Sequence, residues 1–453
     1  MAINRLFVAN RGEIALRILR TAKKLGLETV LALSDADRDS LPAQMADRAV
    51  CLGPAQATKS YLDIGLVLHA AKATGCDALH PGYGFLSERP ELSRRCEAEG
   101  IIFVGPRAES IEALGDKLSA IALARAAGVP TVPGTDHIAS VAQAQAAAEE
   151  IGYPVVMKAS AGGGGKGMFR AGGPADLAAR FDSASREALA AFGDGRLYLE
   201  RFVEAARHVE VQVVGDGAGN VVHFGDRDCS VQRRYQKLIE EGPVTAMPTA
   251  LQERLRAAAV QLTSFAKYRN AGTVEFLYDV ARQEFYFIEV NSRIQVEHPV
   301  SEEITGHDLI ARQLSVAAGL GIGVTQDQVR IAGHAIEVRI NAEDPLNNFL
   351  PSPGRVTGWQ PPAGPGIRID SHIRAGDLIP PFYDSMVGKL IVHGTDRSAA
   401  IEGMLRAIRD FRIEGPKTTL PLAARIVGHP DFRDNRFTTR WLEDKALPAF
   451  LME

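Results

Sequence analysis

The first 110 residues or so alternate short apolar runs with helical periods, and this alternation restricts the folds open to the chain. Residues 5–10 (RLFVAN) are typical of a strand, residues 13–25 carry apolar side chains at helical spacing, and residues 29–34 (TVLALS) are typical of a second strand. Strands that alternate with helices predict a parallel sheet with crossover helices. The first strand ends at Asn10 and Arg11, at the carboxyl end where open α/β sheets usually bind ligands.

The rest of the chain has a different pattern. A Gly/Pro-rich stretch at residues 126–135 indicates a boundary, and residues 153–171 then suggest a strand, a glycine loop and a second strand. Residues 174–191 suit a helix, and the region from 197 to about 277 suits mainly strands, with a helix near 251–268. From about residue 334 we expect strands with Pro and Gly turns and a closing helix from Ser398. The sequence therefore predicts a multidomain α/β and α+β protein.

Charge and cysteine content exclude several classes of protein. Lys and Arg number 51 against 55 Asp and Glu, a net charge of −4, so no global positive field exists to hold nucleic acid or an anionic membrane. The four scattered cysteines form no C-x-x-C pair, which argues against a disulfide framework or a structural zinc site and fits a reducing compartment. No signal peptide and no apolar run of about 18 residues is present. We expect a soluble, cytoplasmic protein.

A run of four glycines, followed by Lys166 and Gly167, is the first candidate for binding chemistry. A Walker loop needs Ser or Thr after its lysine, and a dinucleotide fingerprint must open a helix, whereas residues 168–171 (MFRA) suit a strand. A glycine loop between two strands favours a flexible lid whose backbone N–H groups close over phosphates, with Lys158 as a nearby point charge. A plain mobile hairpin is the alternative interpretation.

Residues 276–278 and 285–288 suit two strands joined by a turn near 281–283. If the pairing is symmetric about Arg282, Glu275 faces Glu289 directly, and opposed like charges are unfavourable unless something lies between them. The strand period places Glu289, Asn291 and Arg293 on one face. Two carboxylates and an amide suit a magnesium ion held with substrate phosphates. A solvated hairpin face with incidental acidic residues is the alternative, and a slip of one residue would undo the pairing.

Arg293 and Glu297 lie four residues apart, so they can share a side of the chain. Such a pair is usually a surface salt bridge. In a cleft beside phosphate it could instead bind a small oxyanion and remove its proton. The run of cations from Arg227 to Pro243 is equally open, because a solvated basic strand would look the same. Lys117 and His208 are uninformative when taken alone.

Together these segments resemble the biotin carboxylase domain of the ATP-grasp superfamily. The strings that carry the resemblance, in order from about residue 3 to about residue 445, are NRGEIA, HPGYGFLSE, GDK, KASAGGGGKGM, RHVEVQ, RDCSVQRR-x-QK, EEGP, EFLY, IEVNSRIQVEHPV, GHAIEVRINAEDP, PSPG and YDSMVGKLIVHG. The resemblance implies an N-terminal α/β domain at 1–113, an ATP-grasp core at 114–330 with a mobile lid at about 131–203, and a C-terminal β-rich domain at 331–453.

The resemblance also implies roles for individual residues. Those expected to bind ATP are Lys117, Lys158, Glu200, His208, Gln232, Tyr235 and the lid glycines Gly162, Gly163, Gly164 and Gly165. Those expected to hold magnesium or manganese are Glu275, Glu289 and Asn291. Those expected around bicarbonate are Lys237, Arg293, Gln295, Val296 and Glu297. Glu297 would be the base and Arg339 would stabilise the biotin enolate. One departure is Tyr235, because the family usually has His in the string RRHQK.

The implied reaction is ATP-dependent carboxylation of biotin on a carrier protein, with bicarbonate and through carboxyphosphate. Two alternatives are an ATP-grasp ligase acting on another small carboxylate or amine, and a non-catalytic ATP-binding subunit. The chain lacks an M-K-M biotinylation tripeptide, so the biotin carboxyl carrier protein and the carboxyltransferase are expected on other chains. The resemblance suggests a homodimer, and the final carboxyl acceptor is chosen by the transferase.

Overall fold

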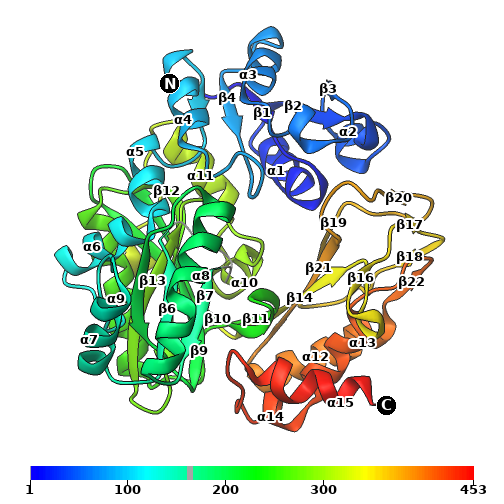
Figure 1. Cartoon of the computed structure of the whole chain (residues 1–453). Coiled ribbons are helices and arrows are strands. Elements are labelled where there is room, and N and C mark those ends of the chain that lie inside the picture. The colour runs from blue at the N-terminus through cyan, green and yellow to red at the C-terminus, as the bar shows by residue number, and fades with distance from the viewer. Residues whose placement is uncertain (1, 161–166, 453) are drawn as a thin grey trace.

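The computed structural model describes residues 2–160 and 167–452 (Figure 1). The N-terminal part contains a five-stranded sheet of order β3-β2-β1-β4-β5, and every neighbouring pair in it is parallel. The strands are β1 (Arg5–Val8), β2 (Glu28–Ser34), β3 (Arg48–Gly53), β4 (Ala78–His80) and β5 (Ile102–Phe103). The connecting helices are α1 (Gly12–Lys24), α2 (Leu41–Met45), α3 (Ile64–Ala73) and α4 (Pro90–Ala98). The predicted parallel sheet with crossover helices is confirmed.

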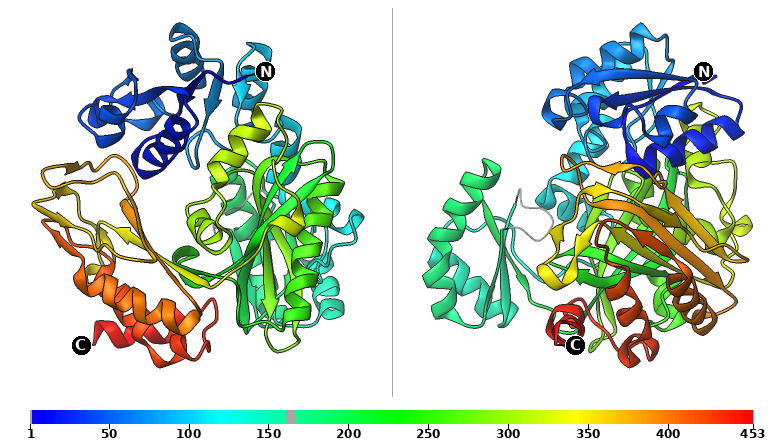
Figure 2. Two further views of the ribbon diagram at one scale, coloured as in Figure 1. Left: turned by 180° about the vertical axis from the view of Figure 1, so that it is seen from behind. Right: turned by 90° about the vertical axis from the view of Figure 1, so that its right-hand side faces the viewer.

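A small unit around the glycine loop stands away from the rest of the molecule in the right-hand view of Figure 2. Its antiparallel sheet, β7-β6-β8, contains β6 (Val155–Ala159), β7 (Met168–Ala171) and β8 (Leu197–Arg201). Helices α7 (Val141–Ile151) and α8 (Pro174–Phe192) pack on it around their own apolar core. The predicted strands on either side of the loop are confirmed, whereas Gly162 to Gly165 lie outside the described residues.

The main sheet has eight strands in the order β13-β12-β9-β10-β11-β14-β21-β19, and all its pairs are antiparallel. The strands are β9 (Ala206–Asp216), β10 (Val221–Arg233), β11 (Gln236–Gly242), β12 (Arg269–Asp279), β13 (Glu284–Asn291), β14 (His334–Asn341), β19 (Ile367–Ser371) and β21 (Met386–Gly394). Because β11 pairs with β14, one sheet continues across the expected boundary at 330/331. Side chains from the central and C-terminal segments can therefore meet on one surface.

Helices join this sheet to its neighbours. The helices α5 (Ala108–Gly115), α6 (Lys117–Ala126) and α9 (Thr249–Phe265) lie beside β9, β12 and β13, and α6 and α9 share a buried apolar cluster with these strands. On the other side, α10 (His298–Thr305) packs against β10 and β14, and α11 (Leu309–Ala317) shares a core with α1 and β1. That shared core fixes the N-terminal sheet against the central one.

The C-terminal segment contains more helices than the sequence indicated. In place of one closing helix from Ser398, the chain forms α12 (Arg397–Asp410), α13 (Leu420–Gly428), α14 (Pro430–Arg433) and α15 (Leu447–Leu451). Proline stands in the first turn of α13 and α14, where it starts a helix but cannot continue the previous one. The last helix, α15, instead continues directly from a π-helix at Leu442–Ala446. The short strands here are β15 (Glu343–Asp344), β16 (Leu350–Pro351), β17 (Gly354–Arg355), β18 (Gly358–Gln360), β20 (Leu378–Ile379) and β22 (Arg412–Glu414). Over the described ranges, every helix is too short or too polar to cross a membrane.

Candidate active site

A cavity of about 1210 Å³ lies between the central sheet, the small unit and the C-terminal segment. Its walls come mainly from the strands β6 to β14, from the first residue of α6, and from the segment between β13 and α10. Every site residue expected from the sequence that the structure describes lines this cavity. These residues are Lys117, Lys158, Glu200, His208, Gln232, Tyr235, Lys237, Glu275, Glu289, Asn291, Arg293, Gln295, Val296, Glu297 and Arg339.

The hairpin of β12 and β13 places Glu275 opposite Glu289, as predicted. The pairing is not symmetric about Arg282, however. Asp279 pairs with Glu284 and Phe276 with Phe287, so Ile288 is an extra residue that shifts the register before Glu289. A bulge of this kind changes which residues face each other beyond it. The expected opposition of the two glutamates therefore depends on this irregularity, which strict alternation does not reveal.

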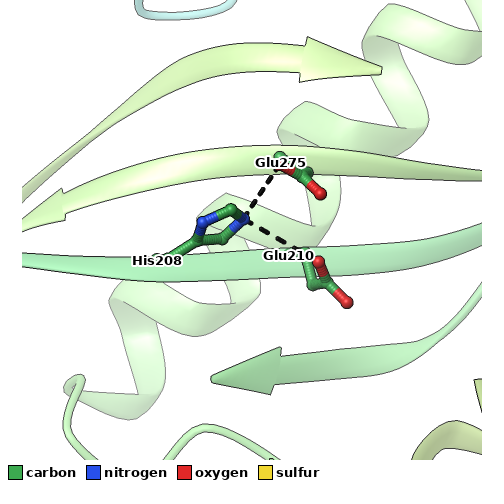
Figure 3. A group of neighbouring side chains, drawn as sticks. All are labelled: His208, Glu210 and Glu275. Atoms are coloured by element: carbon green, nitrogen blue, oxygen red, sulfur yellow. Dashed lines mark ion pairs between the residues drawn. The ribbon is translucent and has the colours of Figure 1, made fainter. Parts of the chain in front are cut away.

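Glu275 and Glu289 have different partners. Glu275 is buried, and its carboxylate lies 2.9 Å from Nε2 of His208 (Figure 3). The same carboxylate lies 3.0 Å from Nζ of Lys237. Burial by itself raises the pKa of Glu275, but Lys237 and His208 outweigh it and hold this pKa well below its ordinary value. Glu289 is more exposed, and its Oε2 lies 3.6 Å from Nζ of Lys117. Glu275 is therefore an ionised group in the ligand-free site.

His208 is held by a hydrogen bond at one ring nitrogen, and a carboxylate lies beside the other. Its Nδ1 lies 2.9 Å from the amide nitrogen of Gln232, which also donates to the carbonyl of Cys229 over 2.7 Å. The amide occupies Nδ1, so the ring proton belongs on Nε2, facing Glu275. Burial lowers the pKa of His208, but the carboxylate of Glu275 outweighs burial and raises it above the ordinary value. The imidazole of His208 at the cavity wall is therefore polarised by the carboxylate of Glu275.

Lys158 and Tyr235 lie at the cavity's outer side. Lys158, on β6, bonds to the carboxylate of Glu200 on the neighbouring strand β8. Tyr235 follows Arg234 in the two-residue turn between β10 and β11, and both residues have positive φ, at +65° and +48°. Two-residue hairpin turns of one common type require positive φ at both positions. Tyr235 is 59% exposed, so its ring lies at the rim of the cavity.

The deepest part of the cavity is a network of alternating charges. Nζ of Lys237, on β11, contacts carboxylates of Glu210 (2.6 Å), Glu275 (3.0 Å) and Glu297 (2.6 Å). Arg339, on β14, donates to Glu297 over 2.9 Å and to Glu240 over 2.6 Å. Glu297 is only 2% exposed. Burial raises its pKa, but Lys237, Arg339 and Arg227 outweigh burial and hold the pKa well below its ordinary value.

The interpretation of Arg293 and Glu297 as a surface salt bridge is wrong. Within the described chain, Arg293 pairs through Nε with Oε2 of Glu88 at 3.0 Å, while Glu297 is buried between Lys237 and Arg339. Both side chains line the same cavity. They contribute separately to its charge, Arg293 at the wall and Glu297 at the floor.

Four residues of this network were missed from the sequence: Glu88, Glu210, Arg227 and Glu240. Arg227 is fully buried, and it donates to Glu210 (2.7 Å) and Gln295 (3.0 Å), so a solvated basic strand does not describe it. Glu210 lies two residues after His208 in RHVEVQ, and a period of two would have placed both on one face. Burial raises the pKa of Glu240 to about 7, although Arg339 beside it acts in the opposite direction.

The donor set beside the hairpin fits a hard divalent cation. Two carboxylates and an amide oxygen, from Glu275, Glu289 and Asn291, are ligands that Mg²⁺ accepts together with phosphate oxygens. A tighter group, His208, Glu210 and Glu275, has ligand atoms within 4.8 Å of one another (Figure 3). Nζ of Lys237 already contacts two of its three members, which neutralises that group. Glu275 belongs to both sets, and Glu289 of the hairpin set likewise has a cation, Lys117, 3.6 Å away. What the hairpin set adds is an amide oxygen and a more exposed carboxylate, which suit Mg²⁺ held with phosphate.

The chain is similar to known proteins along nearly all of its length. Three family models match it: "Biotin carboxylase, N-terminal domain" at residues 2–111, "Carbamoyl-phosphate synthase L chain, ATP binding domain" at 116–324, and "Biotin carboxylase C-terminal domain" at 337–444. A biotin carboxylase from Nostoc sp. is 48% identical over 98% of this chain and 99% of its own length. A biotin carboxylase from Bacillus subtilis is also 48% identical, over 97% of this chain and 98% of its own length.

Solved structures give the same result. A biotin carboxylase complex from Campylobacter jejuni superposes with a TM-score of 0.94 at 44% identity and covers 98% of this chain and 99% of that one. The biotin carboxylase domain dimer of the Hydrogenobacter thermophilus 2-oxoglutarate carboxylase, in complex with MgADP, ADP and bicarbonate, superposes with a TM-score of 0.92 at 43% identity. It covers 98% of both chains.

Proposed function

The chain belongs to the biotin carboxylase family, and we propose that it uses ATP and bicarbonate to carboxylate biotin attached to a carrier protein. The observation that carries the proposal is Glu297, a buried carboxylate held ionised by Lys237 and Arg339 at the floor of the cavity. Lys117, Lys158 and His208 lie along the same cavity, where they suit the phosphates of a nucleotide. An anion site and a phosphate site within one cavity are what this reaction requires.

Electrostatics explain why the cations are needed. Bicarbonate is an anion that must attack a polyanion, so positive charge has to be in place beforehand. Lys237 and Arg293 would hold bicarbonate, with Gln295 and the backbone of Val296 beside it. Glu297 would remove its proton as the oxygen attacks the γ-phosphate and the bond to ADP breaks, so the products are carboxyphosphate and ADP. Because Glu297 is already ionised, it can accept that proton.

The second half of the reaction concerns biotin. Carboxyphosphate breaks down to carbon dioxide and phosphate, and this phosphate removes the proton of the biotin ureido nitrogen. Negative charge then develops on the ureido oxygen, and the nitrogen adds to the carbon dioxide to give carboxybiotin. Arg339 would offset this charge, and Glu240, with its pKa raised to about 7, leaves part of the positive charge of Arg339 available at neutral pH.

The same proposal assigns the residues that would bind the nucleotide and its metal ion. Lys117, Lys158, His208, Glu200, Gln232 and Tyr235 would contact ATP, and Lys158 would exchange its bond to Glu200 for a phosphate. Glu275, Glu289 and Asn291 would hold magnesium, or manganese, which when bound neutralises charge on the phosphates. Support for these assignments comes from the cavity that all nine side chains line.

The proposal also includes the division of the chain into domains and the proteins with which it works. We divide the chain at 1–113, 114–330 and 331–453, which the spans of the three family models support. Solved relatives are subunits or domains of biotin-dependent carboxylases, and one of them is a dimer. We therefore propose that this chain works as a homodimer with a biotin carboxyl carrier protein and a carboxyltransferase.

The test is ADP release by the purified chain with MgATP. We expect release to require bicarbonate and to increase when free biotin is added, and labelled bicarbonate to appear in carboxybiotin. Release that does not depend on bicarbonate would indicate a ligase acting on another substrate. Absence of release under all these conditions would support a non-catalytic ATP-binding role and contradict the proposal.

A further inference from the structure

Lys389, on β21, is a lysine with no exposed surface at all. Its Nζ donates to the backbone carbonyl of Val296 over 2.7 Å and lies 3.3 Å from Oε1 of Glu13. Glu13, in the first turn of α1, also accepts a hydrogen bond from the hydroxyl of Tyr83. A line of polar contacts therefore runs from the N-terminal part through the C-terminal strand β21 to the segment beside the proposed bicarbonate site. In Figure 1, α1 lies next to the sheet end formed by β19 and β21.

A buried lysine carries a cost that its partners must offset. Taking an ammonium out of water is expensive unless it is paired and hydrogen-bonded. Burial lowers the pKa of Lys389, but the carboxylates of Glu13, Glu337 and Asp370 together outweigh burial and raise it above the ordinary value, so the lysine is charged. The nearby carboxylate of Asp370 is bonded to Arg368 over 3.0 and 2.8 Å. Among the described residues, Glu13 is the carboxylate at ion-pair distance from Lys389, and burial outweighs this lysine at Glu13 and raises the pKa of that carboxyl.

The segment that Lys389 reaches has no regular structure of its own. Residues 292–297 connect β13 to α10 outside any strand or helix, so their carbonyl groups need partners from elsewhere. Arg227 binds the side chain of Gln295, and Lys237 and Arg339 bind the side chain of Glu297. For Val296, which lies between them, the contact is made by its backbone, through Lys389.

We propose that Lys389, held by Glu13, is a positioning residue for the bicarbonate side of the reaction, because it fixes the peptide of Val296 and with it the direction of Glu297. The inference rests on the proposed function of that site. The described groups assigned to ATP lie mainly on β6, β8, β9 and α6. Lys389 has its polar contacts with Val296 and Glu13, which lie outside those four elements. Loss of the Lys389 contact should therefore affect bicarbonate and leave ATP binding unchanged.

Four variants separate positioning from general stability. Lys389→Met removes the donor to Val296 but leaves the Glu13 carboxylate buried without its cation. Lys389→Met combined with Glu13→Gln restores charge balance and still lacks the donor. Glu13→Gln alone keeps an acceptor for Lys389 and Tyr83. Arg397→Met is the matched control, because Arg397 also joins a buried carboxylate, Glu241 (2.7 Å), to a backbone carbonyl, that of Phe432 (2.8 Å). Phe432 does not line the cavity, whereas Val296, the partner of Lys389, does.

The measurements are the KM values for bicarbonate and for ATP in bicarbonate-dependent ADP release, with thermal unfolding as the stability readout. We expect the double variant to raise the KM for bicarbonate about tenfold, the factor that one ordinary hydrogen bond is worth, at unchanged KM for ATP. Arg397→Met should lower the unfolding temperature and leave both KM values unchanged, and Glu13→Gln should have the smaller effect on bicarbonate.

A folded double variant with the wild-type KM for bicarbonate would overturn the inference, and so would an equal rise in both KM values. If Lys389→Met alone does not fold, the double variant still decides the question. A wild-type protein that releases ADP without bicarbonate would instead overturn the proposed function, so the two failures give different results.

Discussion

Glu297 shows how a single carboxylate can be both buried and ionised. Its two cationic partners each have another carboxylate: Lys237 also contacts Glu210 and Glu275, and Arg339 also contacts Glu240. If Glu297 were neutralised, both cations would therefore keep an ion pair. This arrangement separates the catalytic effect of a substitution from its effect on folding.

The first prediction follows from that separation. Glu297→Gln keeps the size of the side chain but cannot accept a proton, so we expect bicarbonate-dependent turnover to fall by roughly 10²–10⁴. ATP affinity and the unfolding temperature should change little, because the network retains its other ion pairs. Turnover, nucleotide affinity and thermal unfolding are measured on one preparation. A glutamine enzyme with more than about a tenth of wild-type turnover would place the base elsewhere.

A second prediction at this scale concerns Tyr235, where the family usually has histidine. Tyr235 is exposed at the rim and has a positive φ, and histidine is enriched over most residues in that conformation. Tyr235→His should therefore be tolerated, and any gain in ATP binding should stay within about 1 kcal/mol, the worth of one hydrogen bond. ATP titration of Tyr235→His against Tyr235→Phe separates the ring from the hydroxyl. A large loss of turnover in the histidine variant would show that this rim has a different function here.

At the scale of elements, Arg227 ties four of them together beneath the cavity. It donates from β10 to Glu210 and Gln212 on β9, to Thr273 on β12, and to Ser301 on α10. A fully buried cation with this many partners holds the sheet and the helix in one arrangement. It also holds Gln295 below the bicarbonate site.

We predict that Arg227→Met lowers the free energy of unfolding by about 3–5 kcal/mol, because it leaves Glu210 buried with one cation fewer. Denaturant unfolding measures the change. Adding Glu210→Gln should recover part of the loss, since the unpaired charge disappears. Arg234→Met, at an exposed turn position in the same hairpin, should have a small effect. Equal losses for Arg227→Met and Arg234→Met would contradict the role assigned to the buried guanidinium.

At the scale of the whole molecule, buried neutral histidines join separate parts of the chain. His80, at the end of β4, accepts at Nδ1 from the backbone N–H of Gly82 over 3.0 Å. Its Nε2 lies 3.2 Å from Oε1 of Gln313 on α11, so it donates there. Burial lowers the pKa of His80 to about 3, and burial likewise lowers the pKa of His372 to about 3 and that of His223 to about 4.

These shifts predict sensitivity to acid. The unfolded chain binds a proton at each histidine near pH 6.5, whereas the folded chain does so only near pH 3 or 4. The contribution of these neutral histidines to the unfolding free energy is therefore fully present above about pH 6.5. It is lost as the pH falls from there towards 3. His80→Gln should make the dependence of unfolding free energy on pH shallower by at most about 1.4 kcal/mol per pH unit in this window. Denaturant unfolding at several pH values measures the slope, and an unchanged slope would contradict the prediction.

The local parts of this protein could be predicted from the sequence. Parallel strands, the strands on either side of the glycine loop, and the hairpin that carries Glu275, Glu289 and Asn291 follow from short periods, because a strand or a turn depends on neighbours a few residues away. The sequence motifs shared with the family identified residues that, where the structure describes them, all line the cavity. Even here the bulge at Ile288 was missed, because alternation alone does not show an extra residue.

The pairing of charges depends instead on contacts between distant segments. Glu297 meets Lys237 and Arg339, 60 and 42 residues away, because β11 and β14 are neighbours in one sheet. Lys389 meets Glu13 because α1 packs against the end of that sheet. No local period encodes such contacts, since they depend on strand order and on how the parts pack. The residue types at the site are therefore readable in the sequence, whereas the ionisation of each residue is set by the folded environment around it.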